Sequence, residues 1–292
     1  MNPRASNRSV SSWCSQHRRD DPAVVTHPGV DAATPPPPAL AQVLFGAQLP
    51  LAERYAWWLA GAGVERGLIG PREAERLWPR HLLNCVAVAA LIPRGSHVVD
   101  LGSGAGLPGI VLAIARPDLQ ITLVEPMQRR VAFLDEVRSD LVLPGVDTRR
   151  ARADDLTSAQ LNADIVTARA VAPVARLAAL GAPLLVGGGQ LLAIKGSAVA
   201  AEVSAGWNEV QRAGMTLDAA LLAIVSVDGG PESAGDAGLL PGVQIAELST
   251  WQQNGLLCEG EAAKASRSPL PTDPLALVLR LGHSGHRTSR PR

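Results

Sequence analysis

The chain has 292 residues, 47% of them hydrophobic, and a formal net charge of zero. This length suits one large domain with extensions, and the neutral charge argues against a strongly basic nucleic-acid binder or an acidic solvating protein. No apolar run approaches the roughly 18 residues of a membrane span, the N-terminus lacks an apolar signal core, and the three cysteines lack metal-ligand spacing. We therefore expect a cytoplasmic protein that binds neither membrane nor metal.

The N-terminal third of the sequence divides into a polar tail and a helical region. Residues 1–40 are rich in Ser, Arg, Asp and Pro and end in consecutive prolines, so we expect a disordered tail. Between residues 41 and 93, apolar residues such as Tyr55, Trp58 and Leu59 recur at helical spacing. This region must dock on the part that follows, because its apolar faces are too small to be stable alone.

Residues 94–281 show alternating strand and helix patterns, which are typical of a parallel sheet with helices on both faces. The predicted strands are Val98–Leu101, Ile121–Val124, Val146–Arg150, Asp164–Thr167 and Gln190–Ile194, the last one preceded by a turn at Gly187–Gly189. The predicted helices are Ile110–Ala115, Gln128–Ser139, Val174–Leu184 and Ala198–Ala213.

The pattern weakens after the fifth predicted strand. Leu221–Val227 and Val243–Leu248 both look extended, and Pro274–Leu281 is a convincing last strand. We expect a closing hairpin at one edge of the sheet, with residues 228–273 as a loop-rich insertion between its arms. The His- and Arg-rich residues 282–292 are expected to form a disordered basic tail.

A glycine-rich turn follows the first predicted strand. Asp100 ends the strand, and Gly102, Gly104 and Gly106 follow it. Glycines allow a positive φ and a close approach by a ligand, and the amides of the following helix favour a negatively charged group. The run from Asp100 to Gly106 is the usual first motif of class I S-adenosylmethionine-dependent methyltransferases, so Asp100, Gly102, Gly104 and Gly106 are candidate cofactor contacts. A dinucleotide fingerprint fits only if it starts late, at Gly104, and no Lys-Ser/Thr follows to make a P-loop.

Two further strand ends carry candidate cofactor contacts. Glu125 lies 25 positions after Asp100, at the end of the second predicted strand, where an ionised carboxylate can accept hydrogen bonds from ribose hydroxyls. That role suits NAD and S-adenosylmethionine equally. Ala153 and Asp154 follow the third predicted strand, where a backbone amide and a side-chain acceptor could contact adenine.

The end of the fourth predicted strand bears on the methyl acceptor. It reads Thr167-Ala168-Arg169-Ala170 and lacks the Asn/Asp-Pro-Pro-aromatic motif of enzymes that methylate exocyclic amines, and no cysteine lies between Cys85 and Cys258 to attack a pyrimidine carbon. A nucleophile with its own lone pair remains, such as N7 of guanine, for which positioning beside charged groups suffices. Arg169 and Lys195, at the ends of the fourth and fifth strands, are the catalytic candidates.

With these residues in place, the chain resembles the GidB/RsmG family of bacterial methyltransferases, which methylate N7 of one guanine in small-subunit (16S) ribosomal RNA. The resemblance covers about Leu49 to Ser197 and Pro274–Leu281. It rests on Arg80-His81-Leu82-Leu83, on Val99–Ile110, on Glu125 with Arg129–Leu134, on Arg152-Ala153-Asp154, on Thr167–Ala170 and on Lys195-Gly196. Cys85 stands where Ser is expected, and Asp154 where Glu is commoner.

The resemblance implies an α/β fold of class I S-adenosylmethionine-dependent methyltransferases: a Rossmann-like doubly wound, mostly parallel sheet with an antiparallel last strand, preceded by a small helical region. It implies S-adenosyl-L-methionine as cofactor and 16S ribosomal RNA as partner, within a small-subunit particle or assembly intermediate, for a monomeric enzyme. The cofactor would contact Gly102, Leu107, Ala153, Asp154 and Arg169. The RNA would face Arg80, His81, Arg130 and Lys195.

Three other functions remain compatible with the residues. A nicotinamide-dependent oxidoreductase would share Glu125 and the glycines but bind NAD. A small-molecule methyltransferase would keep the methyl donor and not need RNA. A non-catalytic binding module would retain the fold and transfer no methyl group.

Overall fold

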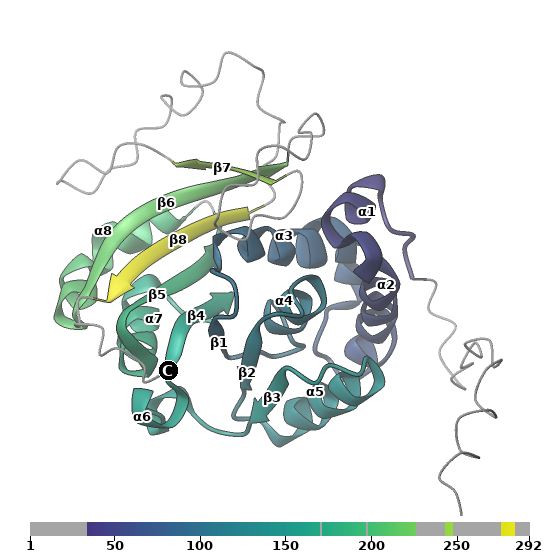
Figure 1. The fold of residues 1–292 in the computed structure, drawn as a ribbon, viewed down its shortest axis with the longest axis horizontal. Helices are drawn as coiled ribbons and strands as arrows, with labels where there is room; N and C mark the ends of the chain where they lie inside the picture. Colours follow the sequence, from purple (N-terminus) through teal and green to yellow (C-terminus); the bar gives the residue numbers. More distant parts are fainter. Residues whose placement is uncertain (1–33, 170, 197, 226–242, 248–275, 284–292) are drawn as a thin grey trace, which may run out of the picture. The chain divides into compact units, whose positions relative to one another are not determined.

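The computed structural model describes residues 34–169, 171–196, 198–225, 243–247 and 276–283 (Figure 1). Most of the predicted tails and of the predicted insertion lies outside the described residues. Near the boundary predicted at residue 40, α1 begins at Ala39, and the indole nitrogen of Trp78 donates a hydrogen bond to the carbonyl of Pro35 at 2.8 Å. In the described part, no helix has the length and hydrophobicity that crossing a membrane requires.

The described strands form a single eight-stranded sheet in the order β3-β2-β1-β4-β5-β8-β6-β7. All neighbours among β1 to β5 pair in parallel, as the alternation of strands and helices predicted, and this places their carboxyl ends at one edge. The strands are β1 His97–Leu101, β2 Gln120–Val124, β3 Val146–Arg149, β4 Ala163–Arg169, β5 Leu185–Lys195, β6 Met215–Val225, β7 Val243–Glu247 and β8 Ala276–His283.

The far side of the sheet is antiparallel. β8 pairs with β5 on one side and with β6 on the other, so β6 and β8 form the predicted closing hairpin and the last strand is inserted beside β5. β7 adds a further antiparallel strand next to β6. The predicted mostly parallel sheet with an antiparallel last strand is therefore confirmed.

The predicted turn at Gly187–Gly189 is wrong as a boundary, because these glycines lie inside β5. The register with β4 shifts there: Ala163 is opposite Leu185, whereas Ile165 is opposite Gln190. Gly188 has a φ of +76°, which glycine adopts without a steric penalty. The glycines thus form an irregularity within the strand and do not precede it.

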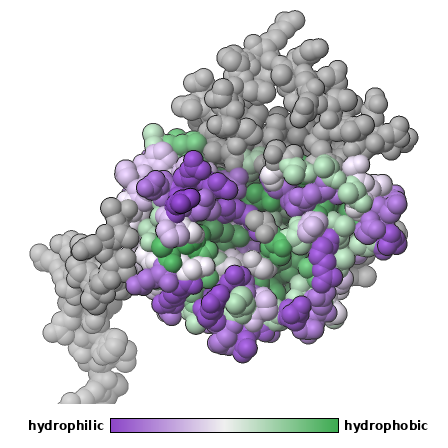
Figure 2. All heavy atoms as spheres, turned by 180° about the vertical axis from the view of Figure 1, so that it is seen from behind, coloured by the Kyte–Doolittle hydropathy of each residue, from purple (hydrophilic) through white to green (hydrophobic). Residues whose placement is uncertain are grey.

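Helices cover both faces of the sheet (Figure 1). Val98 belongs to the apolar cluster under α4 and α5, while its neighbour Val99 belongs to the cluster under α7 and α8, as the alternation of side chains along a strand requires. The helices are α1 Ala39–Phe45, α2 Leu49–Trp58, α3 Leu83–Val86, α4 Gly109–Ala115, α5 Gln128–Asp140, α6 Ser158–Leu161, α7 Val174–Gly181 and α8 Val199–Arg212. On the face opposite to that of Figure 1, hydrophobic residues gather in the middle and hydrophilic residues around them (Figure 2).

The N-terminal helical region docks on the α4 and α5 side. Short 3-10 and π turns connect its helices: Gly46–Gln48, Leu59–Gly63, Pro71–Arg76, Leu77–Leu82 and Ala87–Leu91. Arg54 and Trp58 of α2 both donate hydrogen bonds to the carboxylate of Asp140 at the end of α5. Arg66 forms a two-pronged ion pair with Glu136. These contacts hold the region against the sheet domain, as its small apolar faces predicted.

Candidate active site

The turn between β1 and α4 is built on glycines, as predicted. Gly102, Gly104 and Gly106 have φ values of +69°, +59° and +101°, which residues with side chains rarely adopt. A Cβ on Gly106 would lie 2.9 Å from the hydroxyl oxygen of Tyr55. That hydroxyl donates a hydrogen bond to the carbonyl of Ala105 at 2.8 Å. The tip of the turn is therefore packed directly against α2.

Asp100 lies beneath this turn. Its carboxylate accepts hydrogen bonds from the amide of Gly109 at 3.1 Å and from the hydroxyl of Thr167 at 3.3 Å, and burial raises its pKa to about 6. We predicted that Asp100 contacts the cofactor, but the structure gives its carboxylate internal partners. The reason is Gly109, where a Cβ would lie 2.8 Å from the carboxylate: the missing side chain lets α4 start in contact with Asp100.

An open pocket of about 420 Å³ lies at the carboxyl ends of β1 to β4, which is where parallel α/β sheets bind ligands. It is lined by Leu101, Gly102, Val124, Glu125, Pro126, Met127, Arg130, Ala151, Arg152, Ala153, Asp154, Arg169, Val171, Arg176 and Leu180. The predicted cofactor residues Gly104, Gly106 and Leu107 do not line this pocket. A second pocket of about 600 Å³ surrounds Leu185, at the amino end of β5, away from the ligand edge of the sheet.

Glu125 joins the glycine turn to the start of α5. Its carboxylate accepts hydrogen bonds from the amide of Gly104 at 3.1 Å and from the amide of Met127 at 3.0 Å, and Arg130 lies 3.5 Å away. The side chain is 1% exposed. A carboxylate offers about four acceptor positions, so each oxygen retains capacity for a ligand hydroxyl.

Arg130 adds an observation that bears on ligand binding. Its Nε is buried and has no hydrogen-bond partner among the described residues, although its guanidinium lies beside Glu125 in the lining of the pocket. Buried donors without a partner are uncommon in folded proteins. The acceptor capacity of Glu125, next to this guanidinium in the pocket lining, fits a pocket that receives a polar ligand with hydroxyl groups.

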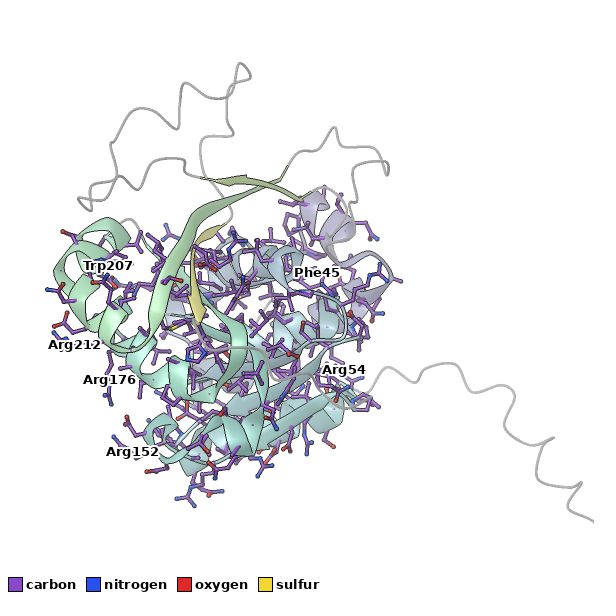
Figure 3. All side chains as sticks on the ribbon, turned by 60° about the vertical axis from the view of Figure 1, so that its left-hand side comes forward. Phe45, Arg54, Arg152, Arg176, Trp207 and Arg212 are labelled. Atoms are coloured by element: carbon purple, nitrogen blue, oxygen red, sulfur yellow. The ribbon has the colours of Figure 1, made fainter. Side chains whose placement is uncertain are left out.

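Asp154 and Arg176 meet across the pocket rim. Both carboxylate oxygens of Asp154 lie within hydrogen-bond distance of Nη2 of Arg176, at 3.1 and 2.9 Å. Both side chains are about half exposed, and such pairs contribute only ~0–1 kcal/mol, so the carboxylate remains able to exchange partners. Figure 3 shows Arg176 and Arg152 on the same side of the molecule. No spacing in the sequence indicated Arg176, because it lies in an otherwise apolar helix.

Arg169 connects the end of β4 to the N-terminal region. Its guanidinium donates hydrogen bonds to Nδ1 of His81 at 2.6 Å, to the carbonyl of Arg80 at 3.2 Å and to Sγ of Cys85 at 3.5 Å. Burial raises the pKa of the Cys85 thiol to about 11, so the sulfur stays protonated at neutral pH. Arg169 lines the pocket as well.

His81 is buried between two charged groups. Its Nε2 lies 3.0 Å from the carboxylate of Glu73, and the other ring nitrogen faces Arg169. Burial, followed by the positive charge of Arg169, lowers the pKa of His81 to about 4. The prediction that His81 faces RNA is therefore not matched by its position. Arg80 next to it is 57% exposed and pairs with the same oxygen of Glu73 at 3.1 Å. No pattern in the sequence indicated this role for Glu73.

Lys195 also differs from its predicted position. Its ammonium donates to the carbonyl of Ala172 at 2.9 Å and pairs with Glu202 at 2.6 Å, and the side chain is 7% exposed. The cause is α8, which starts just after β5 and places Glu202 next to the end of the strand. Lys195 thus holds the chain that follows β4, and its charge is not presented to a ligand or to RNA.

In the part of the chain that the structure describes, no group of three or more His, Cys, Asp and Glu residues could hold a metal ion.

Comparison with known proteins identifies the family. The model of the family described as "rRNA small subunit methyltransferase G" matches residues 48–224. Proteins named ribosomal RNA small subunit methyltransferase G are similar to this chain: the protein from Thermobifida fusca is 56% identical over 176 residues, covering 60% of this chain and 74% of that protein. The protein from an Arthrobacter species is 53% identical over 174 residues, covering 60% and 80%.

Among solved structures, an S-adenosylmethionine-dependent O-methyltransferase from Thermotoga maritima aligns with a TM-score of 0.41 at 12% identity, over 71% of this chain and 66% of that one. The family match spans more than half of the chain and contains the glycine turn, Glu125, Asp154 and Arg169. The chain belongs to the rRNA small subunit methyltransferase G family.

Proposed function

We propose that this protein is an S-adenosylmethionine-dependent methyltransferase that methylates N7 of a specific guanine in 16S ribosomal RNA. One observation carries the proposal. In a chain of this family, the pocket at the carboxyl edge of the sheet places an acceptor, Glu125, beside the glycine turn and a guanidinium, Arg169, at the end of β4.

The pocket residues fit the methyl donor. Glu125 would accept hydrogen bonds from its ribose hydroxyls, and Ala153 and Asp154 would contact its adenine. Arg169 has five N–H donors. Three of them donate to His81, Arg80 and Cys85, and the other two would bind the methionine carboxylate. When bound, S-adenosylmethionine supplies an electrophilic methyl group on a positively charged sulfur.

The side chains around the pocket support a ring nitrogen as the acceptor. Guanine N7 carries its own lone pair, so the protein needs no general base, and its task is to orient the base and exclude water. The thiol of Cys85 is protonated and already bonded to Arg169, and this argues against a cysteine nucleophile. The neutral His81 is bonded on both ring nitrogens, which leaves it no proton transfer to perform.

The exposed arginines near the site support an RNA partner. Arg80 and Arg176 have more than half of their side chains exposed, and Arg130 and Arg152 line the pocket. Guanidinium groups suit phosphate contacts, and such contacts would offset the few kcal/mol needed to unstack a guanine. Because the chain has no net charge, we infer that it binds its RNA locally, within a small-subunit particle or assembly intermediate, as a cytoplasmic monomer.

Mass mapping of 16S RNA from cells with and without the gene tests the proposal. We expect one guanine to lose a methyl group on its N7 when the gene is deleted and to regain it on complementation. An unchanged RNA would refute the assignment.

Calorimetry with S-adenosylhomocysteine and with NAD distinguishes a methyltransferase from an oxidoreductase, because an oxidoreductase would bind NAD alone. A small-molecule methyltransferase predicts that Arg80→Ala leaves methyl transfer to small subunits intact.

A further inference from the structure

One oxygen of Glu73 receives two donors from the neighbouring turn. Nε of Arg80 lies 3.1 Å and Nε2 of His81 lies 3.0 Å from Oε2 of Glu73. Glu73 belongs to the 3-10 turn Pro71–Arg76, and the other two residues belong to the π turn Leu77–Leu82. Arg80 is exposed and His81 is buried, so this carboxylate joins a surface cation to an interior ring.

The hydrogen bonds around His81 select one tautomer. A guanidinium can only donate, so Nδ1 of His81 must accept the 2.6 Å hydrogen bond from Arg169 and carries no proton. The proton of the neutral ring is then on Nε2 and is donated to the carboxylate of Glu73. The alternative tautomer would turn an N–H of the ring toward the N–H groups of Arg169. Glu73 therefore stabilises the ring form that Arg169 requires.

Arg169 is held in the pocket wall by this arrangement. The guanidinium donates to three acceptors in one segment, at Arg80, His81 and Cys85, and the bond to His81 is the shortest of the three. The guanidinium lines the same pocket as Glu125 and Asp154. A change in the orientation of this guanidinium would alter ligand binding in the pocket, because a contact group must be held in one rotamer to bind well.

We propose that Glu73 is a positioning residue for the pocket: by holding His81 in the tautomer with a proton on Nε2, it fixes the guanidinium of Arg169. The part of the inference that concerns ligand affinity rests on the proposed function, since it takes Arg169 as a contact of the methyl donor. The part that concerns the ring of His81 is a property of the free protein.

The first test measures the tautomer directly. In ¹⁵N-labelled free protein at pH 7, long-range correlations of the imidazole rings distinguish a protonated ring nitrogen from an unprotonated one, and the His81→Asn variant identifies the His81 signals. We expect a protonated Nε2 in the wild type and in Glu73→Gln, whose amide oxygen still accepts the proton. In Glu73→Ala only Arg169 still selects the tautomer, so we expect the population of the form with a protonated Nε2 to fall and the signals to become partly averaged.

The second test measures affinity for S-adenosylhomocysteine by calorimetry. We expect Glu73→Ala to weaken binding about fivefold and Glu73→Gln to stay within about twofold, because one hydrogen bond to a charged group is lost or kept. Glu75→Gln is the matched control: Glu75 lies in the same turn with an exposed side chain and should leave both measurements unchanged. A folded Glu73→Ala that keeps the wild-type tautomer and affinity would overturn the proposal, as would equal losses in the Ala and Gln variants.

If Glu73→Ala does not fold, His81→Asn and His81→Leu decide. The Asn oxygen can replace Nδ1 as an acceptor for Arg169, so we expect affinity close to wild type, whereas Leu should lose it about fivefold. Equal affinities of the two variants for S-adenosylhomocysteine would contradict the positioning role.

Failure of the proposed function is recognised by a separate measurement. If the wild type does not bind S-adenosylhomocysteine, the cofactor assignment is wrong. Comparison of the His81 tautomers in the wild type, Glu73→Ala and Glu73→Gln then still tests whether Glu73 holds the ring.

Discussion

The hydroxyl of Tyr55 in α2 donates a hydrogen bond to the carbonyl of Ala105, at the tip of the glycine turn, across a distance of 2.8 Å. Both residues are buried. The N-terminal helical region therefore contacts the glycine turn itself, in addition to the end of β4. Removal of this hydrogen bond should lower the affinity of the pocket for its ligand as well as the stability of the fold.

Tyr55→Phe removes the bond while keeping the ring. We expect the free energy of unfolding to fall by about 1–2 kcal/mol, because the carbonyl of Ala105 loses its buried donor. The affinity for S-adenosylhomocysteine should fall about threefold, since the turn that carries Gly104 becomes less well fixed. Urea unfolding and calorimetry measure the two effects. Tighter binding by the variant would show that the bond does not support the pocket.

Gly109→Ala should be strongly destabilising. A Cβ at this position would lie 2.3 Å from a methyl group of Leu123 and 2.8 Å from the carboxylate of Asp100, so α4 and β1 would have to move apart. We expect a loss of about 2–3 kcal/mol, typical of overpacking in a core, measured by urea unfolding. Gly196→Ala is the control, because nothing lies within 4 Å of the added Cβ. Similar losses in both variants would contradict the steric explanation.

Asp100 should make stability depend on pH. Burial raises its pKa from 3.8 to about 6, so the folded state binds a proton more tightly than the unfolded state. Its contribution is greatest below pH ~4 and is lost as the pH rises through 6, by an amount on the order of 3 kcal/mol. In Asp100→Asn this loss should be absent. Urea unfolding of both proteins between pH 4 and 7 gives the difference, and parallel curves would rule out the shifted pKa.

Lys195 and Glu202 should behave as a coupled pair. Removing one partner leaves the other buried or half-buried without compensation, so Lys195→Met should cost about 2–3 kcal/mol of stability. The double variant Lys195→Met with Glu202→Gln should recover part of that loss, and a double-mutant cycle measures the coupling. A direct contact to RNA predicts the opposite pattern: unchanged stability, weaker RNA binding and a smaller salt dependence of binding.

The sequence predicted the parts of the site that follow from strand ends. The glycine turn, Glu125, Asp154 and Arg169 each follow a recognisable strand, and parallel strands bring their carboxyl ends together. Tyr55, Glu73 and Arg176 were missed because their partners lie far away in the chain or on another element, and no periodicity encodes such contacts. Lys195 and His81 were misplaced for a related reason: a cation at a strand end looks exposed until the acid that covers it is known.

The position of β8 has a consequence for the order in which the chain becomes able to fold. β8 lies between β5 and β6, yet it is made after both of them, and synthesis runs from the N-terminus. Until Ala276–His283 has emerged from the ribosome, β5 has a free edge and β6 is paired at most with β7. A nascent chain or a truncation that stops before Ala276 therefore exposes unpaired strand edges, even though every pocket residue has already been synthesised.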